Sequence, residues 1–369
     1  MPVAPRISDK ARLAYSDIAN IDYSRDYAMS HDADAYAALQ HYVSPDDHAR
    51  LVIQADGLAG AGRLYSFLAG LDTNVPIPDF REPGALEEAG QTSLAMYDFE
   101  GARQVYRNFL SWMFRTFRVD ETEFRRDLIR RLRVSDGARV LITGCGNGDD
   151  VLAALEAVGP AGRVYASDLA PEMVVATYAA LVEKGGDALA RTSLSVCNAG
   201  SLPFENDFFD AAFHFGGINL FDDVKGAIHE MTRVTKEGGR VVFGDEGVAP
   251  WLANTDYGRM VIANNYLWAH RAPIDMLPHA AVDPSLSWVL GNCFYLIDFE
   301  KRSSGPFIDP DVPHVGRRGG TMRSRYYGQL EGVSPELKEA VLKAAAEQKT
   351  SVTEWLERAI RESIDRNPR

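Results

Sequence analysis

Residues 139–148 constrain the fold of this chain more than any other segment. They read R-V-L-I-T-G-C-G-N-G, an apolar strand that runs directly into glycines spaced G-x-G-x-G. Glycine has no Cβ, so such a loop lets the backbone approach a ligand, and the helix that follows offers free N–H groups. A dinucleotide fingerprint needs its third glycine at position 149, where Asp149 would repel a pyrophosphate, so NAD and FAD are poor fits. A tight strand-to-helix turn without a ligand is the alternative that the loop alone leaves open.

Two later segments favour a ligand. Residues 163–168 read as a second strand that ends in Asp168. This acid follows the glycines at the distance, about 20 residues, where a carboxylate can accept hydrogen bonds from both hydroxyls of a ribose. The next apolar strand ends at Asn198, whose side-chain oxygen can accept a hydrogen bond from an amine. The alternation of strands and helices predicts an α/β fold with a mostly parallel sheet and a ligand at the carboxyl ends of its strands.

The order of these motifs resembles that of class I S-adenosylmethionine (SAM) methyltransferases. The block from 137 to 246 is most similar to the ubiquinone/menaquinone C-methyltransferase family, and it covers under a third of the chain. The motifs that carry the resemblance are the glycine loop at 139–148, D-L-A-P-E-M at 168–173, N-A-G-S-L-P-F at 198–204, F-D-A-A-F-H-F-G-G-I-N at 209–219 and R-V-T-K-E-G-G-R at 233–240.

The resemblance implies a Rossmann-like class I methyltransferase core, with an antiparallel strand 7, that uses SAM. Within it, the glycine loop would receive the methionine and ribose end, Asp168 would hold the ribose, and apolar side chains would surround the adenine. The expected cofactor-binding residues are Tyr97, Gly144, Cys145, Gly146, Gly148, Asp168, Leu169, Met173, Asn198 and Ala199.

The sequence departs from this family at two positions. Ile142 stands where many members carry an acid that helps to hold the methionine end of SAM. We expect backbone carbonyls, Asp149 or Asp150, or a group from outside the core, to contact the ammonium instead. Ile218 precedes Asn219 where the quinone methyltransferases have Arg-Asn. The second departure counts against a quinone as the methyl acceptor.

Composition excludes several other classes of protein. The formal net charge of −13 argues against a general binder of nucleic acid or anionic membranes. No apolar run approaches the ~20 residues that span a bilayer, and the acidic N-terminus lacks the apolar region of a signal peptide. The three cysteines cannot all pair, and we expect them to be reduced in a cytoplasmic protein.

Helix and turn signals divide the chain into three regions. Residues 1–95 are predicted to form an N-terminal arm and a helical cap or dimerisation region, with a helix that starts at Ser44 and a linker at 73–92. Residues 96–333 are the predicted core. It begins with an apolar-faced helix at 98–117 that packs on the core or on a second subunit, and it contains an aromatic-rich insertion at 247–292. Strand 6 is predicted at 293–299, and strand 7 at 321–330. Residues 334–369 are predicted to form a helical hairpin that opens with a capped helix at Ser334, its second helix starting at the capping box 351–354.

Candidates for a general base lie in the insertion and after strand 5, and they are Asp245, Glu246, Tyr266, His270 and His279. We name His270, His279, Tyr266 and Asp245 as candidate catalytic residues, needed if the acceptor is a hydroxyl, a thiol or an acidic C–H. His214 lies within predicted strand 4 and is more typical of a core histidine. His270, Asp275 and His279 fit no metal-ligand spacing, so no metal site is predicted.

Arginines near the C-terminus form the basic cluster of this acidic chain. Their glycine neighbours permit close approach, and predicted strand 7 would place them at the acceptor side of the cleft. They therefore predict a small-molecule acceptor with a carboxylate or phosphate, while a solvated loop that pairs with acids is the alternative. These candidate substrate-binding residues are Arg317, Arg318, Arg323 and Arg325.

Two further expectations concern partners. We expect a homodimer, and nucleic acid is an unlikely partner of so acidic a chain. A strand followed by two helices over 322–366 resembles a ribbon-helix-helix module, so a SAM-sensing DNA-binding regulator is the alternative function. A helical hairpin that packs on the core or pairs subunits is the other interpretation of the same tail.

Overall fold

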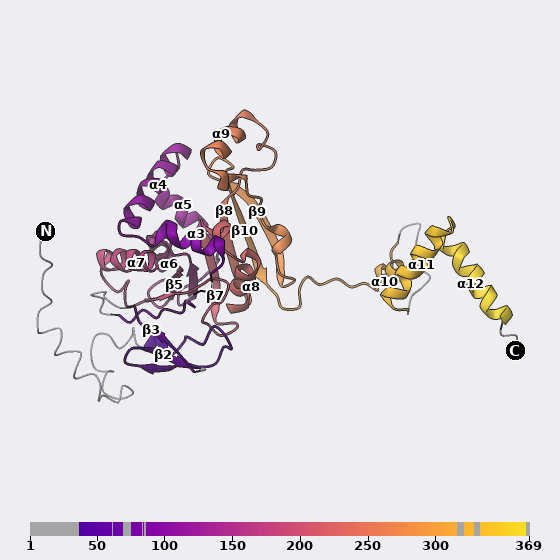
Figure 1. Cartoon of the computed structure of the whole chain (residues 1–369), viewed down its shortest axis with the longest axis horizontal. Coiled ribbons are helices and arrows are strands. Elements are labelled where there is room, and N and C mark those ends of the chain that lie inside the picture. The colour runs from indigo at the N-terminus through magenta and orange to yellow at the C-terminus, as the bar shows by residue number, and fades with distance from the viewer. Residues whose placement is uncertain are drawn as a thin grey trace, which may run out of the picture. The chain divides into compact units, whose positions relative to one another are not determined.

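The computed structural model describes residues 37–60, 62–68, 75–82, 84, 86–315, 321–327 and 333–366. The chain separates into two compact units, Met1–Pro306 and Phe307–Arg369, and each is described by itself (Figure 1). None of the described helices is long and apolar enough to cross a membrane.

The first unit is built around a mixed β-sheet. In the described part of the chain this sheet has seven strands in the order β6-β5-β4-β7-β8-β10-β9. Neighbouring strands pair in parallel except that β10 runs antiparallel to both β8 and β9. This order, with one antiparallel strand, is that of the class I methyltransferase fold, as the sequence motifs predicted. The strands are β4 (Arg139–Thr143), β5 (Arg163–Asp168), β6 (Thr192–Val196), β7 (Phe209–Phe215), β8 (Thr235–Glu246), β9 (Ala281–Val289) and β10 (Phe294–Lys301).

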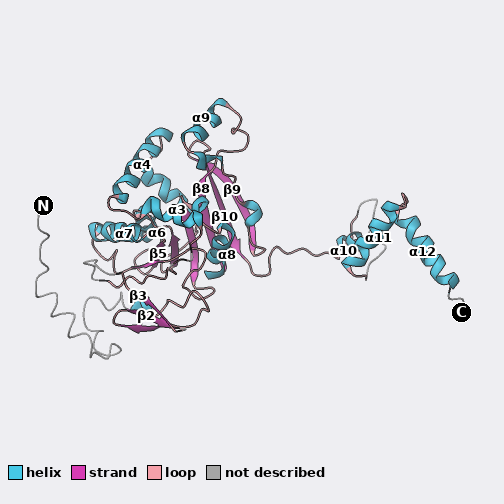
Figure 2. Cartoon of the chain, in the orientation of Figure 1, coloured by secondary structure: helices cyan, strands magenta, loops and turns pink. Residues whose placement is uncertain are grey.

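Each face of the sheet packs against its own hydrophobic core, because alternate strand residues point to opposite faces. Val140 and Ile142 of β4 belong to one core, with residues of α4 to α7, while Leu141 belongs to the other, with residues of α8 and of a small N-terminal sheet. Figure 2 shows the strands in magenta and the helices in cyan. The helices of the first unit are α3 (Glu88–Tyr97), α4 (Ala102–Phe117), α5 (Glu121–Arg130), α6 (Asp149–Ala157), α7 (Pro171–Lys184), α8 (Val224–Val234) and α9 (Asp256–Asn264).

The N-terminal region differs from the predicted helical cap. The helix predicted to start at Ser44 is wrong: residues 45–47 form a turn, in which the Ser44 hydroxyl accepts a hydrogen bond from the Asp46 N–H at 3.3 Å. A described three-stranded antiparallel sheet follows, with β1 (Val52–Gln54), β2 (Gly57–Gly60) and β3 (Arg63–Ser66). A Cβ on Gly57 would lie 2.3 Å from the Tyr65 carbonyl oxygen, so glycine permits the close pairing of β2 with β3.

The predicted linker at 73–92 also contains regular structure. Residues 78–80 pair in parallel with the edge strand β6, through a hydrogen bond from the Phe80 N–H to the Val196 carbonyl at 2.8 Å. The helix α3 then begins at Glu88, inside the segment expected to be a linker. The helix predicted at 98–117 is confirmed as α4, and its buried residues Leu110 and Met113 lie in the core of the first unit.

The last strands of the sheet were misassigned from the sequence. The segment predicted as strand 6 is β10, the antiparallel strand, and the sixth strand of the fold is β9, which lies inside the predicted insertion. The segment predicted as strand 7 contains a helix, α10 (Met322–Tyr327), in the second unit. β10 is almost wholly buried and β9 is mostly exposed after its first two residues, so neither pattern identifies the antiparallel strand, which only the pairing partners reveal.

The second unit confirms the predicted helical hairpin. Its helices are α11 (Pro335–Glu347) and α12 (Val352–Arg366). The capping box is present: Ser351 Oγ accepts from the Glu354 N–H, and a Glu354 carboxylate oxygen accepts from the Ser351 N–H, both at 3.2 Å. Because residues 322–327 are helical, the strand that a ribbon-helix-helix module requires is absent from the described part of this unit.

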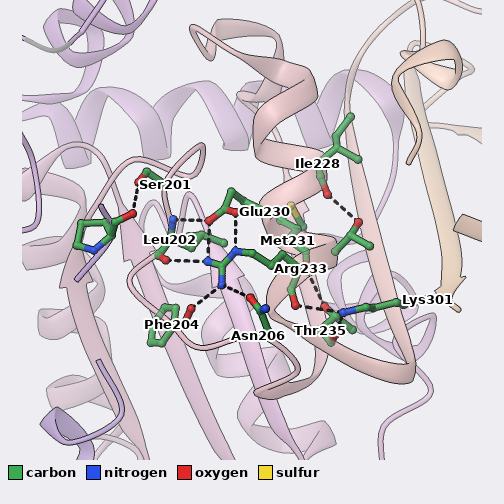
Figure 3. Close-up of polar contacts among 12 residues, drawn as sticks. Ser201, Leu202, Phe204, Asn206, Ile228, Glu230, Met231, Arg233, Thr235 and Lys301 are labelled. Atoms are coloured by element: carbon green, nitrogen blue, oxygen red, sulfur yellow. Dashed lines mark hydrogen bonds and ion pairs between the residues drawn. The ribbon is translucent and has the colours of Figure 1, made fainter. Parts of the chain in front are cut away.

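A partly buried polar network fixes the loop that follows β6. Arg233, at the end of α8, donates to the carbonyls of Phe204 at 2.8 Å and Leu202 at 3.0 Å, and it pairs with Glu230 (Figure 3). Glu230 in turn accepts from the Leu202 N–H at 2.9 Å. Lys301 donates to the Thr235 carbonyl at 2.7 Å and so fastens β10 to the same region. The network ties the L-P-F segment to α8 and thereby positions the residues at the end of β6.

Candidate functional site

A cavity lies at the carboxyl ends of β4, β5, β7 and β8, beneath α3 and α4. This is the edge at which open α/β sheets bind their ligands. Its walls come from the glycine loop, from the ends of the strands, and from an aromatic lid supplied by α3 and α4. The residues that line it are Gly90, Ser93, Tyr97, Tyr106, Phe109, Leu110, Met113, Phe114, Arg125, Gly144, Gly146, Ser167, Asp168, Leu169, Met173, Cys197, Asn198, Ala199, His214, Phe215, Gly216, Gly217, Leu220, Phe221, Asp222, Glu246, Leu267 and Phe294.

The glycine loop has the geometry of a ligand cradle. Gly144 has a φ of 64°, and a Cβ on it would lie 2.8 Å from Cε1 of His214. Gly146 has a φ of 52°, and a Cβ there would lie 3.2 Å from the ring of Tyr106. Both glycines therefore sit in the left-handed region where side chains are strained, and both keep the cavity open.

Asp168 closes the end of β5 and faces the same cavity. One oxygen of its carboxylate accepts from the Gly146 N–H, and the other from the Ala170 N–H, both at 3.0 Å. Burial raises the pKa of Asp168 to about 6, although these N–H donors oppose the shift. The carboxylate thus ties the glycine loop to the end of β5 and stands where a ribose is expected.

Most of the residues predicted to hold a cofactor are brought together. Tyr97, Gly144, Gly146, Asp168, Leu169, Met173, Asn198 and Ala199 all line the cavity. Cys145 and Gly148 do not: Cys145 is buried, and its N–H donates to the Ser167 carbonyl at 2.9 Å. Gly148 forms the N-cap of α6 against Thr177. The side-chain oxygen of Asn198 accepts from the Gly200 N–H at 2.9 Å and keeps one further lone pair for a ligand.

The lid is held in place by an acid from the far side of the cavity. The helix α3 has no side-chain cap of its own at Glu87. Instead, Asp222 accepts from the Glu87 N–H at 3.0 Å and from the Gly90 N–H. The ring of Tyr97 then meets the ring of Tyr106 edge to face, with centroids 5.8 Å apart. The sequence contains no local signal for this long-range cap.

The candidate catalytic residues of the insertion are not in the cavity. His270, His279 and Tyr266 are exposed and do not line it, so their selection as catalytic residues finds no support in the cavity geometry. The insertion folds so that Leu267 faces the cavity while Tyr266 is 66% exposed. His279 instead lies against Gly305.

Asp245 does not line the cavity either. Its side chain is fully buried, and it accepts from the Asn219 N–H at 2.7 Å and from the Glu246 N–H at 2.8 Å. Glu246, the last residue of β8, lines the cavity instead. Burial, and then the neighbouring Asp245, raise the pKa of Glu246 well above the usual range of a glutamate.

His214 behaves as the core histidine that its place in β7 suggested. Its Nδ1 donates to the Thr143 carbonyl at 2.9 Å, which leaves Nε2 without the proton. Burial lowers the pKa of His214, so the ring is neutral at pH 7. Among the described residues Nε2 finds no hydrogen-bond partner, and it is closed off from solvent.

The two acids after the glycine loop face a buried arginine. Arg125 of α5 donates to Asp150 at 2.8 Å and to Glu121 at 2.7 Å, and it lies 4.0 Å from Asp149. Asp150 is therefore already paired, which argues against its expected contact with the methionine ammonium. The arginine itself lines the cavity.

The predicted arginine cluster lies in the second unit. Arg317 and Arg318 fall outside the described residues. Arg323 and Arg325 belong to α10, and Arg323 makes a two-pronged contact with Asp311, at 2.7 and 2.9 Å. The expected position of the cluster on a strand at the sheet edge was wrong, and its role in substrate binding stays a prediction.

Comparisons with known proteins agree with the strand order. Residues 141–243 match the family model described as a methyltransferase domain. The demethylmenaquinone methyltransferase of Anoxybacillus flavithermus is 35% identical over 119 residues, which are 32% of this chain and 49% of that protein. The ubiquinone/menaquinone biosynthesis C-methyltransferase UbiE of Burkholderia vietnamiensis is 34% identical over 114 residues, 31% of this chain and 45% of that protein. The chain thus spans about half the length of these curated relatives.

A solved structure of phosphoethanolamine N-methyltransferase 2 from Haemonchus contortus, in complex with SAM, is also similar. Its TM-score is 0.45 at 14% identity, over 62% of each chain. The assignment of the fold rests on the strand order of the sheet and on the matched domain.

Proposed function

We propose that the methyltransferase domain at 141–243 makes this chain a SAM-dependent methyltransferase, which transfers a methyl group to a small molecule. The observation that carries the proposal is a single cavity, which brings together the glycine loop, Asp168 and Asn198 from three neighbouring strand ends. When bound, SAM supplies a methyl group on an already activated sulfonium, so the protein mainly has to orient the reactants and exclude water.

Each wall of the cavity has a distinct part in this proposal. The backbone of Gly144 and Gly146 admits the methionine and ribose end, in a conformation where a Cβ would crowd the rings of His214 and Tyr106. Asp168 accepts hydrogen bonds from the ribose hydroxyls, and Asn198 contacts the adenine edge with Leu169 and Met173 beside it. Tyr97 closes the cavity from α3 and excludes water.

Calorimetric titration of the full chain with SAM tests the proposal. We expect low-micromolar affinity, and Asp168→Ala should weaken it roughly 100-fold, because two hydrogen bonds to a charged acceptor are lost. Asp256→Ala is a matched control, since the Asp256 side chain is 97% exposed on α9. Unchanged binding by Asp168→Ala would remove the ribose assignment, and no binding by the wild type would remove the function.

An acceptor with a carboxylate or phosphate remains a narrower possibility within this function. It depends on the arginines of the second unit reaching the acceptor, and the pairing of Arg323 with Asp311 supports the solvated alternative. Replacement of Arg323 and Arg325 by Gln should raise the acceptor Michaelis constant more than tenfold, with SAM affinity unchanged, if the cluster binds substrate. Unaltered kinetics would leave the cluster as a solvated surface.

The cytoplasmic location and the homodimer are proposals of the same kind. The acidic composition and the reduced cysteines support the first. The apolar face of α4 gives less support to the homodimer than the sequence suggested, because apolar residues of α4 pack on the core of their own chain. Light scattering after gel filtration distinguishes a monomer from a dimer.

A further inference from the structure

The cavity extends beyond the part that SAM would occupy. The glycine loop, Asp168 and Asn198 lie at the ends of β4, β5 and β6, while a second part lies over β7, β8 and β10. In that second part the acidic side chains are Glu246 and Asp222, of which Asp222 is engaged by the N-terminus of α3, and the other walls are largely apolar. They consist of Phe109, Met113 and Phe114 from α4, Leu267 from the insertion, and Phe294 from β10.

We propose that Glu246 takes a proton from the methyl acceptor, and that the reacting end of the acceptor is an uncharged, apolar group that carries a hydroxyl. This inference rests on the proposed methyl transfer. It adds the catalytic base and the chemical class of the acceptor.

The charged residues that line the cavity argue against an anion at the reacting end of the acceptor. Arg125 is the cation that lines the cavity in the described part of the chain, and its guanidinium is already paired with Glu121 and Asp150. An anionic group would also meet Glu246 and Asp222. No ion pair would therefore compensate for the free-energy cost of removing the anion from water. A flat apolar group, in contrast, fits the aromatic and aliphatic walls.

The backbone of Glu246 is fixed at the wall of the cavity. Glu246 ends β8 and is 8% exposed, and its backbone carbonyl accepts from the Asn219 side chain at 2.8 Å. Tyr295 of β10 donates to the oxygen of the same Asn219 side chain at 3.0 Å. No basic residue forms an ion pair with the Glu246 carboxyl in the described ranges, so its proton-accepting capacity is not spent on a partner of the opposite charge.

The groups that face Glu246 keep its proton affinity high. Asp245 is the neighbouring acid, and its side chain accepts from the N–H groups of Asn219 and Glu246. The neighbouring tyrosines are neutral at pH 7, because burial raises the pKa of each of them. The titratable groups packed against this corner are Asp245 of β8, Tyr97 of α3, Tyr106 of α4, Tyr295 of β10, His214 of β7 and Arg125 of α5.

The proton balance of the step is simple. The acceptor oxygen forms a bond to the methyl carbon while the bond from that carbon to sulfur breaks, and the electron pair stays on sulfur. The hydroxyl proton passes to the Glu246 carboxylate and later to solvent. Only the ionised form of Glu246 can accept it, so the rate must rise with pH through the pKa of this carboxyl.

Binding of a matched probe series tests the acceptor class. The full chain, loaded with S-adenosylhomocysteine, is titrated at pH 7 with 2-naphthol, 2-naphthoate and naphthalene. We expect 2-naphthol to bind at least tenfold more tightly than 2-naphthoate, and Glu246→Gln to reduce its advantage over naphthalene. The proposal is overturned if 2-naphthol does not bind, or if 2-naphthoate binds as tightly.

The pH dependence of methyl transfer to 2-naphthol tests the base. In single turnovers with methyl-labelled SAM, the pH–rate profile of the wild type should have a rising limb. The apparent pKa of this limb should lie above the ordinary pKa range of a glutamate. Glu246→Gln should lose this limb and be at least about 100-fold slower, keeping only the limb from ionisation of naphthol itself. Asp245→Asn should move the limb to lower pH, because a neighbouring negative charge is removed.

A failure of this inference is distinct from a failure of the proposed function. Wild type, Glu246→Gln and Asp245→Asn should all bind SAM with similar affinity, since neither residue faces the expected ribose or adenine. If none binds SAM, the proposed function falls. If all bind SAM but naphthol is not methylated, or Glu246→Gln keeps the wild-type rate and limb, Glu246 is not the base.

Discussion

At the scale of single residues, the proposed contact of Asp168 with the ribose would make ligand binding depend on pH. Burial raises the pKa of Asp168 to about 6, and only the ionised carboxylate can accept both ribose hydroxyls. We therefore expect the affinity for SAM to be constant above about pH 7 and to fall as pH drops below about 6. Calorimetric titrations between pH 5 and pH 8 measure it, with Asp168→Asn as the variant that cannot titrate.

The stability of the ligand-free protein should change in the opposite direction. Because the pKa of Asp168 in the folded state lies above its unfolded value of 3.8, the folded state binds this proton more tightly. Its contribution to stability is fully present below that unfolded value and is lost as pH rises through about 6. For the affinity prediction, two results would contradict the assignment of Asp168 to the ribose. One is a wild-type SAM affinity that does not change between pH 5 and pH 8, and the other is an equal pH dependence of the affinity in Asp168→Asn.

Arg233, the first residue of the R-V-T-K-E-G-G-R motif, has a structural rather than a catalytic role. Its guanidinium donates to the carbonyls of Leu202 and Phe204 and pairs with Glu230 (Figure 3). Arg233→Ala should lower the free energy of unfolding by roughly 3 kcal/mol, because these part-buried acceptors lose a charged donor and Glu230 loses its partner. Urea denaturation measures the change.

A surface pair serves as the control for Arg233. Arg126 and Glu156 form an ion pair whose side chains are both nearly half exposed, so Arg126→Ala should cost no more than about 1 kcal/mol. Equal losses in the two variants would show that the network in Figure 3 does not hold the loop.

Local chemistry explains which of the predicted site residues line the cavity. Gly144, Gly146 and Asp168 act through their own backbone conformation or strand end, so a short stretch of sequence identifies them. Asp245 and Glu246 are adjacent and chemically alike, and successive side chains of a strand point to opposite faces. Only the packing of β8 between its neighbours decides that Glu246, and not Asp245, faces the cavity.

At the scale of elements, the lid depends on one long-range cap. Asp222 holds the N-terminus of α3 through the N–H groups of Glu87 and Gly90. Asp222→Ala should make the closed position of the lid less favourable by about 1 kcal/mol, and it should therefore weaken SAM binding about fivefold. Amide hydrogen exchange in α3 should become faster, while exchange in α7 stays unchanged.

Asparagine at the same position is the matched control for the lid. An Asn side chain caps helices about as well as Asp, so Asp222→Asn should keep both affinity and slow exchange near wild type. Slow exchange of α3 in Asp222→Ala would mean that the packing of Tyr97 and Tyr106, and not the cap, holds the lid.

The elements that were misread from the sequence share a physical cause. Ser44 and Asp46 belong to a turn-forming sequence that also resembles a helix start, because the same side chains accept backbone N–H groups in both. The predicted sixth strand has the right pattern, but its antiparallel pairing with β8 is a long-range property. The parallel part of the sheet and the tail helices were predicted because periodicity and caps are local signals.

At the scale of the whole molecule, the first unit has the means to bind its ligand alone. The residues of its two large cores lie between positions 39 and 299, and every residue that lines the cavity lies between 90 and 294. The second unit, Phe307–Arg369, begins in a segment without helix or strand, in which Phe307 is 90% exposed and Ile308 is 64% exposed.

Limited proteolysis tests this independence. Chymotrypsin should cut the full chain first after Phe307, because this side chain is exposed and its backbone has no strand or helix pairing to lose. The product that ends at Phe307, identified by mass spectrometry, should bind SAM with the affinity of the intact chain. Phe307→Ala should delay this cut and serves as the control for its position. A cleaved product that loses affinity for SAM, or that binds SAM but no longer methylates 2-naphthol, would show that the second unit and its arginines contribute to the site.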